Sequence, residues 1–175
     1  MRTRVSPMEL KARVAAAALA LSAIASPALA ADTATAVLKD PEGKEVGAVT
    51  LRAVPTGVLL DTKLSGFPPG DHAFHIHGTG KCEPPSFKSA GGHFNPEEDE
   101  HGLENSAGPH GGDMPNIHVP ESGELHIEVL NQMVSLGGLL GGEGTAIVVH
   151  QKGDDYKSNP AGDAGPRIAC GVIAE

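Results

Sequence analysis

Hydrophobic and polar residues alternate over short stretches of this chain, and helical periodicity is scarce after the first thirty residues. Alternation over roughly 4–8 residues is typical of half-buried β-strands. Turn signals such as Asp40-Pro41-Glu42-Gly43 and Val54-Pro55-Thr56-Gly57 separate the runs. The pattern therefore predicts an antiparallel β protein, either a sandwich or a flattened barrel. Strands are expected over 35–39, 46–53, 58–64, 72–77, 124–130, 145–150 and 167–173.

Two long stretches lack this alternation and are predicted to be loops, one from 78 to about 116 and one from 151 to 166. Long ordered loops in a compact domain are usually functional. Residues 32–35 are expected to form a loose tail. Because the chain has only four Phe, one Tyr and no Trp, Val, Ile and Leu are expected to fill the core.

The first thirty residues have the three parts of an export signal. A basic segment precedes an apolar run over 14–24, and Ala28-Leu29-Ala30 forms a small-residue cleavage signal. The apolar run is shorter than the roughly 20 residues that a membrane span needs. We therefore expect a cleaved signal peptide over 1–30 and a single, exported mature domain over 31–175. The signal segment itself does not distinguish a periplasmic location from release to the medium.

The only two cysteines are Cys82 and Cys170. Export implies an oxidising compartment, so a single disulfide is expected, the alternative being two reduced, buried thiols. A bridge between these positions would close a long loop. In the chain-entropy model, such a cross-link stabilises the folded state by about 4–5 kcal/mol.

The mature part is strongly acidic. The signal segment holds four basic residues and one acid (Arg2, Arg4, Lys11, Arg13 and Glu9), so 9 basic and 21 acidic residues remain, a formal charge of −12. Such a charge argues against binding to nucleic acid or to anionic membranes. It would also repel an anionic substrate, which would need a local positive group.

Seven metal donors fall at spacings that suit two neighbouring ions: His75, His77, His93, His101, His110, Asp113 and His150. His75 and His77 share one face of a predicted strand, because side chains at i and i+2 point the same way. Seven donors are one short of two four-coordinate sites. A shared ligand, such as an imidazolate that binds through both nitrogens, would supply the eighth.

If His93 is the shared ligand, the donors divide by chemistry. His93, His101, His110 and Asp113 give three nitrogens and a carboxylate, which is typical of structural zinc. His75, His77, His93 and His150 give four imidazoles, which suit Cu(II). His118 and His126 have no partner at ligand spacing, so we expect them to be solvent-facing or satisfied strand histidines.

Five long motifs carry a resemblance to a known family: FHIHGTGKC (74–82), AGGHFNP (90–96), GPHGGDMPN (108–116), VVHQKGDD (148–155) and GDAGPRIACGVI (162–173). In these motifs the chain resembles the copper/zinc superoxide dismutases, especially the bacterial exported, periplasmic branch. The resemblance covers nearly the whole mature chain. It implies an all-β, Greek-key sandwich or flattened eight-stranded barrel with two long functional loops.

The resemblance also assigns roles to individual residues. It implies copper ligands His75, His77, His93 and His150, and zinc ligands His93, His101, His110 and Asp113, with one copper and one zinc ion per chain. Asp154 resembles the carboxylate that links a copper-side histidine to a zinc-side one. Arg167 resembles the arginine that guides superoxide, Cys82 and Cys170 resemble the intrachain disulfide, and His72 resembles a structural histidine.

The implied activity is the disproportionation of superoxide to dioxygen and hydrogen peroxide by cycling of copper between Cu(II) and Cu(I). In this mechanism His93 donates a proton and is catalytic together with Arg167. A metal buffer is the second hypothesis, although carriers of Cu(I) favour Met and Cys ligands. An extracellular adhesion domain would explain the strands but not the donors. The sequence leaves open whether the mature chain is a monomer or a homodimer.

Overall fold

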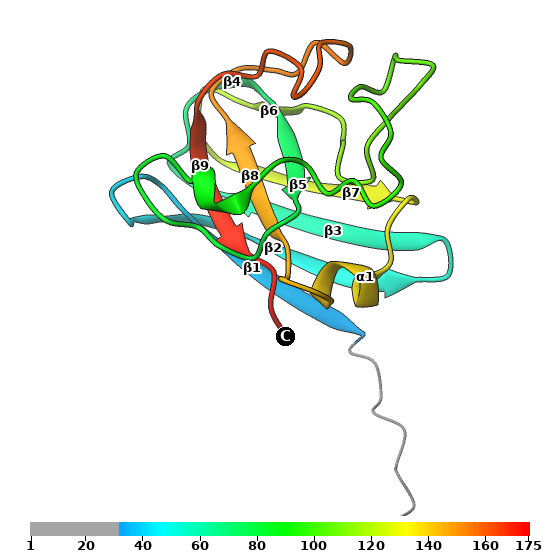
Figure 1. Cartoon of the computed structure of the whole chain (residues 1–175). Helices are drawn as coiled ribbons and strands as arrows, with labels where there is room; N and C mark the ends of the chain where they lie inside the picture. The colour runs from blue at the N-terminus through cyan, green and yellow to red at the C-terminus, as the bar shows by residue number, and fades with distance from the viewer. Residues whose placement is uncertain (1–31) are drawn as a thin grey trace, which may run out of the picture.

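The computed structural model describes residues 32–175, so the predicted signal peptide and its cleavage site lie outside the described residues. Strands account for most of the regular structure (Figure 1). They are β1 (Thr33–Lys39), β2 (Glu45–Val54), β3 (Gly57–Leu64), β4 (Gly70–His72), β5 (Phe74–His77), β6 (Ile117–Val119), β7 (Leu125–Asn131), β8 (Ala146–His150) and β9 (Arg167–Val172). A 3-10 turn, η1 (Lys88–Ala90), and a short helix, α1 (Leu136–Leu140), complete the set.

The strands form an antiparallel, curled sheet. Seven of them pair in the order β5-β8-β9-β1-β2-β3-β7, and β4 pairs with β6 in a second, two-stranded sheet. Ala73 alone separates β4 from β5, so these two short strands act as one broken strand that joins the sheets. Residues 32–175 therefore provide eight strand positions, and the predicted all-β, Greek-key fold is confirmed.

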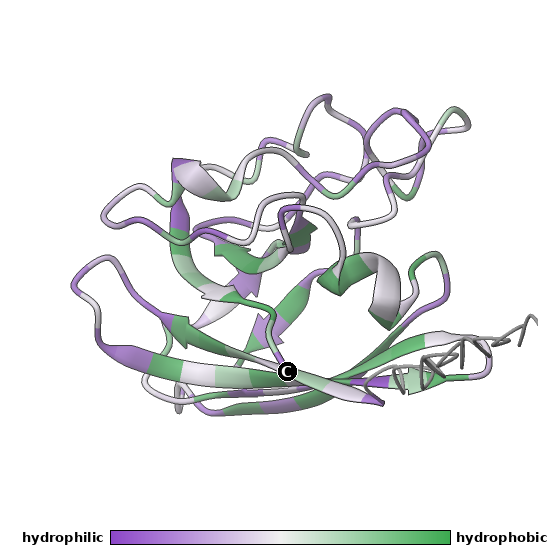
Figure 2. Cartoon of the chain, turned by 60° about the horizontal axis from the view of Figure 1, so that its bottom comes forward, coloured by the Kyte–Doolittle hydropathy of each residue, from purple (hydrophilic) through white to green (hydrophobic). Residues whose placement is uncertain are grey.

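Alternating burial places the core on the concave side of the sheet. Along β1 every second residue is buried, and β3 shows the same period of two. Figure 2 shows the corresponding alternation of green and purple bands along the long strands. Aliphatic residues fill most of the core, as expected, and the aromatic rings of Phe67 and Phe74 pack with them.

Strands β5 and β8 are buried at every position. One face of β8 packs into the main core through Ile147 and Val149. The other face packs through Ala146 and Val148 against a small cluster that includes Phe87 of the first long loop. These strands are thus covered on both sides, and the loop that covers them also carries metal donors.

Both predicted loops are present, because no strand lies between 78 and 116 or between 151 and 166 and only η1 interrupts the first. Two other expectations were wrong. The single strand predicted over 72–77 is divided, because Ala73 bonds to the second loop and to the end of β8 instead of continuing a ladder: its N–H donates to Lys152 O at 2.8 Å and its carbonyl accepts from His150 N at 2.9 Å. The predicted loose tail is also wrong, since Thr33 and Ala34 pair with Arg52 and Leu51 in β1–β2.

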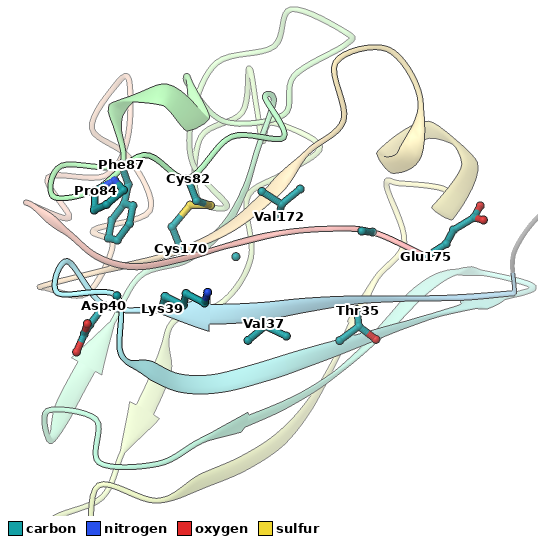
Figure 3. A pocket seen from close by; sticks show the side chains of 13 residues that line it. Thr35, Val37, Lys39, Asp40, Cys82, Pro84, Phe87, Cys170, Val172 and Glu175 are labelled. Carbon is teal, nitrogen blue, oxygen red and sulfur yellow. A yellow bond between two sulfur atoms is a disulfide. The ribbon is translucent and has the colours of Figure 1, made fainter.

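Cys82 and Cys170 form the predicted disulfide, with their Cα atoms 5.7 Å apart. It ties the first long loop to β9 at the wall of a groove of about 560 Å³ (Figure 3). Val37 of β1 and Val172 of β9 border this groove and are partly exposed. Among the described residues, no helix has the length and apolar character to cross a membrane.

Candidate metal centre

The first donor group is built on β5 and β8. Phe74 and Ile76 point into the core, so His75 and His77 share the opposite face of β5, as the period of two predicts. His150 ends β8, which pairs with β5. His93 arrives from the first loop and forms an isolated β-bridge with His77. The ligand atoms of these four histidines all lie within 4.8 Å of one another.

An outer contact holds the far ring nitrogen of three of these histidines. His77 Nδ1 lies 2.9 Å from Gly91 O, His150 Nδ1 lies 3.1 Å from Gly165 O, and His75 Nε2 lies 2.7 Å from Asp154 Oδ2. The opposite nitrogen of each ring faces the centre of the group. His77 Nε2 and His150 Nε2, for example, are 3.4 Å apart. Outer partners of this kind fix the tautomer and orientation of metal-binding histidines.

The second donor group surrounds the buried carboxylate of Asp113. Its Oδ1 lies 2.7 Å from His93 Nδ1 and 3.3 Å from His110 Nδ1. Its Oδ2 lies 3.0 Å from His101 Nδ1 and accepts backbone N–H bonds from Gly102 and His110. The ligand atoms of this group also lie within 4.8 Å of one another. The first loop thus folds its three histidines around the carboxylate of Asp113, its fourth donor.

His93 belongs to both groups. Its side chain is 1 % exposed, and its Nδ1 faces Asp113 in the second group. Its Nε2 is buried and has no hydrogen-bond partner among the described residues. The ring centroid lies 4.0 Å from that of His75 on one side and 5.1 Å from that of His101 on the other. The sharing of one imidazole that the donor count suggested is present in the structure.

The residues present fit copper and zinc. Three buried ring nitrogens, His75 Nδ1, His93 Nε2 and His101 Nδ1, make no hydrogen bond within residues 32–175, and a buried polar atom without one is costly. His101 Nδ1 lies 3.0 Å from Asp113 Oδ2, but not in hydrogen-bonding geometry. All three belong to the two donor groups. Four imidazoles suit copper, and three imidazoles with one carboxylate suit zinc. Metal coordination would satisfy the three nitrogens together.

Burial keeps three histidines of the first group neutral. It lowers the pKa of His75 to about 4 and that of His150 to about 3, and it lowers the pKa of His77 well below its usual range. Burial would raise the pKa of Asp113, but the hydrogen bonds from His93 and from Gly102 N outweigh it and lower that pKa. Neutral imidazoles and an ionised carboxylate are the forms that bind metals.

Asp154 links the two groups. Its Oδ2 lies 2.7 Å from His75 Nε2 and its Oδ1 lies 3.0 Å from His101 Nε2. The carboxylate is nearly inaccessible, at 1 % exposure. Gly162 passes so close that a Cβ there would collide with Asp154 Oδ1, and its φ of +66° suits glycine. The structure thus places Asp154 in the linking position that the sequence implied.

Arg167 lies beside the first group. Its guanidinium donates to Phe87 O and to Gly91 O, both at 2.6 Å. Gly91 O also contacts His77 Nδ1, so one carbonyl joins the arginine to a copper-side ligand. Burial lowers the pKa of Arg167. The pKa of His77 is lowered mainly by burial, next by the neighbouring His93, and then by the positive charge of Arg167.

The other three histidines lie outside both groups. His72 is buried, and its ring nitrogens lie 2.8 Å from His150 O and 2.9 Å from Pro68 O, which suits the structural role expected of it. His118 and His126 are exposed strand histidines, and each pairs with an aspartate, Asp71 and Asp61 respectively. The expectation that they are solvent-facing strand residues is confirmed.

Sequence reasoning missed two residues near Asp154. The side-chain amide of Asn116 and the backbone and hydroxyl of Tyr156 all bond around it. The available signal was their spacing, since Asn116 follows Asp113 by three residues and Tyr156 follows Asp154 by two. The spacing alone does not show that the two loops meet.

Comparison with known proteins agrees with this geometry. Residues 45–173 match the family described as copper/zinc superoxide dismutase (SODC). The chain is 51 % identical over 138 residues to Cu–Zn superoxide dismutase 1 of Aquifex aeolicus, a match that covers 75 % of this chain and 82 % of that protein. The Cu–Zn enzyme of Caulobacter vibrioides is 48 % identical over 148 residues, covering 81 % of this chain and 85 % of that one.

A solved structure supports the same assignment. The Cu/Zn superoxide dismutase from Brucella abortus superposes with a TM-score of 0.70 at 30 % identity, and the match covers 81 % of this chain and 99 % of that one. The chain therefore belongs to the copper/zinc superoxide dismutase family.

Proposed function

We propose that the mature chain is an exported copper/zinc superoxide dismutase. The reaction takes two superoxide anions and two protons to one dioxygen and one hydrogen peroxide. One observation carries the proposal: the buried ring of His93 is shared by a four-imidazole group and a three-imidazole, one-carboxylate group. A site for metal storage alone has no need of a shared ring or of a guanidinium beside it.

The bound metals supply one-electron chemistry at copper and a fixed positive charge at zinc. Arg167 binds and orients the superoxide anion. A guanidinium has five N–H donors and stays charged at neutral pH. The bonds to Phe87 O and Gly91 O hold its direction, and the remaining donors are left for the anion.

His93 supplies a proton to the reduced product. Its Nδ1 faces Asp113, so Nε2 is the atom that holds and delivers this proton, and the second proton comes from solvent. Because the side chain is 1 % exposed, the ring cannot swing into solvent between turnovers without local opening. The bond from Nδ1 and the bridge to His77 keep Nε2 directed at the copper-side group.

Export to the periplasm is part of the proposal and rests on the signal-like segment over 1–30. Cell fractionation with N-terminal sequencing of the mature protein tests it. A cytoplasmic product that still carries residues 1–30 would contradict export, but not the proposed activity. Analytical ultracentrifugation of the mature chain tests whether it forms a homodimer.

The deciding experiment measures metal content and superoxide decay on the same preparation. We expect one copper and one zinc per chain and rapid decay of superoxide. His93→Ala should impair both sites, whereas Asp113→Ala should mainly weaken zinc binding. His126→Ala is the matched control, because His126 is exposed and lies outside both groups.

Two outcomes would contradict the proposal. A protein that binds both metals tightly and does not accelerate superoxide decay would be a metal buffer. A fully active wild-type protein with a single metal ion per chain would rule out the shared ligand.

A further inference from the structure

The Asp154 carboxylate is held by a second layer of contacts behind it. Tyr156 N donates to Asp154 Oδ1 at 2.6 Å. This bond reaches the same oxygen that faces His101. The carboxylate therefore has three hydrogen-bond partners in fixed directions: His75, His101 and the backbone N–H of Tyr156. The backbone conformation at residue 154 determines whether the carboxylate can face both histidines at once.

Asn116 fixes that backbone. Its side-chain Oδ1 accepts from Asp154 N at 2.7 Å, and its Nδ2 donates to Asp154 O at 2.9 Å. One amide thus binds both polar groups of the Asp154 main chain. Asn116 lies between the zinc-side ligand Asp113 and β6, so these two bonds join the end of the first loop to the second loop.

Tyr156 closes the ring of contacts. Its hydroxyl oxygen accepts from Asn116 N at 2.7 Å, and its carbonyl accepts from Glu104 N at 3.1 Å. Its φ is +63°, a left-handed conformation that is uncommon for residues other than glycine. In this conformation the N–H of Tyr156 reaches Asp154, its carbonyl reaches Glu104 in the first long loop, and its hydroxyl reaches Asn116.

We propose that Asn116 and Tyr156 are positioning residues, which hold Asp154 between His75 and His101 and thereby set how tightly the two sites bind their metals. This inference rests on the two-metal centre of the proposed function. Neither residue is among the metal donors, so their effect on the metals is expected to pass through Asp154. Loss of either would let the carboxylate rotate and release one histidine ring.

Tyr156→Phe gives the sharpest test, because it removes one hydroxyl and keeps the backbone N–H bond to Asp154. In the protein loaded with copper and zinc, we expect zinc transfer to a coloured chelator to become about 3–10-fold faster. The effect should be smaller than the 10–100-fold loss typical of direct outer partners. Asn116→Ala removes two bonds and should have the larger effect of the two variants.

The decisive comparison is a double-mutant cycle with Asp154→Asn. If Tyr156 acts through Asp154, adding Tyr156→Phe to Asp154→Asn should change zinc release by less than about twofold. Thr145→Val is the matched control, because it removes a buried hydroxyl that donates to Leu139 O at 2.8 Å, away from both donor groups. It should lower the melting temperature and leave zinc release unchanged.

Two results would overturn the proposal. Zinc release from Tyr156→Phe no faster than from Thr145→Val would mean that the hydroxyl does not position Asp154. An undiminished effect in the Asp154→Asn background would mean that Tyr156 supports the fold in general. Superoxide decay by the loaded wild type is measured separately, so failure of the proposed activity is distinguishable from failure of this inference.

Discussion

A ring shared between two metal sites must be directed at both, and at the residue scale the backbone around His93 does much of this. His93 forms a β-bridge with His77, Phe94 N donates to Ile76 O at 2.8 Å, and Gly78 N donates to Gly92 O at 2.9 Å. These bonds anchor the segment to β5 independently of any metal. The donors of the first group are therefore largely preorganised by strands, which favours tight and specific coordination.

Arg167 should be the residue whose charge matters most for turnover. The mature chain carries a formal charge of −12 and repels superoxide as a whole, and the local guanidinium offsets this at short range. Steering effects of this type span roughly 10- to 10³-fold in rate. We expect Arg167→Ala to slow superoxide decay and Arg167→Glu to slow it further, at low ionic strength and with both metals still bound.

The control for charge alone is Arg52→Glu. Arg52 is exposed on β2, three strands from β8 in the sheet order, and the change in net charge is the same. Its effect on the rate should be small. Full activity in both Arg167 variants at low ionic strength would show that Arg167 does not attract the substrate.

Asp154→Asn should weaken metal binding without removing a ligand. The substitution keeps the shape but removes the charge and one acceptor, so it cannot satisfy both His75 Nε2 and His101 Nε2. A loss of 10–100-fold in metal affinity or activity is typical for such partners. Competition with a chelator measures it. Asp155→Asn is the matched control one residue away, since Asp155 is exposed; equal effects from the two variants would contradict the prediction.

At the scale of elements, the disulfide should stabilise the fold and also the position of Arg167. Cys82 lies in the loop whose Phe87 and Gly91 carbonyls hold the guanidinium, and Cys170 lies on β9 with Arg167. In the chain-entropy model, this cross-link stabilises the folded state by about 4–5 kcal/mol. For a domain of this size, a fall in Tm on the order of 10 °C is therefore expected on reduction.

Calorimetry with and without reductant measures this fall. A variant with both Cys82→Ser and Cys170→Ser should show the lower Tm under both conditions, and reductant should then have no effect on it. Activity should fall with stability, because a loosened loop no longer fixes the guanidinium. Two free thiols in the native wild-type protein, or a Tm indifferent to reductant, would contradict the prediction.

The local hydrophobic pattern predicted most of the strands. It failed where pairing between distant segments determines the strand boundaries. Alternation marks β1, β2, β3 and β7, because one face of each is solvated. Around Ala73 the pattern continues while the partner strand changes from β6 to β8, so the sequence showed one strand where there are two. Strand β6 is three residues long and α1 contains Gly137 and Gly138, so neither produces a recognisable period.

The donors were predictable because metal chemistry restricts both residue type and spacing. His75 and His77 follow from strand geometry alone, and the remaining ligands lie in ordered motifs. The directions of the rings were not predictable. That His75 presents Nδ1 to the centre and Nε2 to Asp154 depends on the second loop folding over the first. The Asn116 and Tyr156 contacts depend on the same meeting of loops, which leaves no periodic trace in the sequence.

At the scale of the whole molecule, the mature chain is acidic, and its first long loop contains a cluster of acidic residues. Glu97, Glu98, Asp99 and Glu100 are consecutive and exposed. Four of the seven metal donors lie in this same loop, and six of the seven are buried. The molecule thus combines a strongly charged surface with a buried centre, in which burial lowers the pKa values of His75, His77 and His150.

That burial predicts how the metal-free protein responds to acid. The pKa of His75 is lowered to about 4 and that of His150 to about 3 by burial, whereas an unfolded histidine titrates near 6.5. Below about pH 6.5 the unfolded chain therefore binds more protons than the folded one. The stabilisation is complete above that pH and is lost as the pH falls towards the folded pKa values, by up to about 1.4 kcal/mol per pH unit for each histidine.

The ionised Asp154 also stabilises the folded state, and this stabilisation is lost as the pH falls, but at a lower pH. Burial opposes its ionisation, but the hydrogen bonds from His75 and His101 lower its pKa to about 2, so its contribution is lost only below about pH 4. Urea unfolding of the metal-free protein at several pH values between 7.5 and 4.5 should thus report the histidines. His75→Gln should flatten the pH dependence, whereas His126→Gln should leave it intact because His126 is exposed. An unfolding free energy independent of pH over this range would mean that these rings are not buried as neutral imidazoles when the metals are absent.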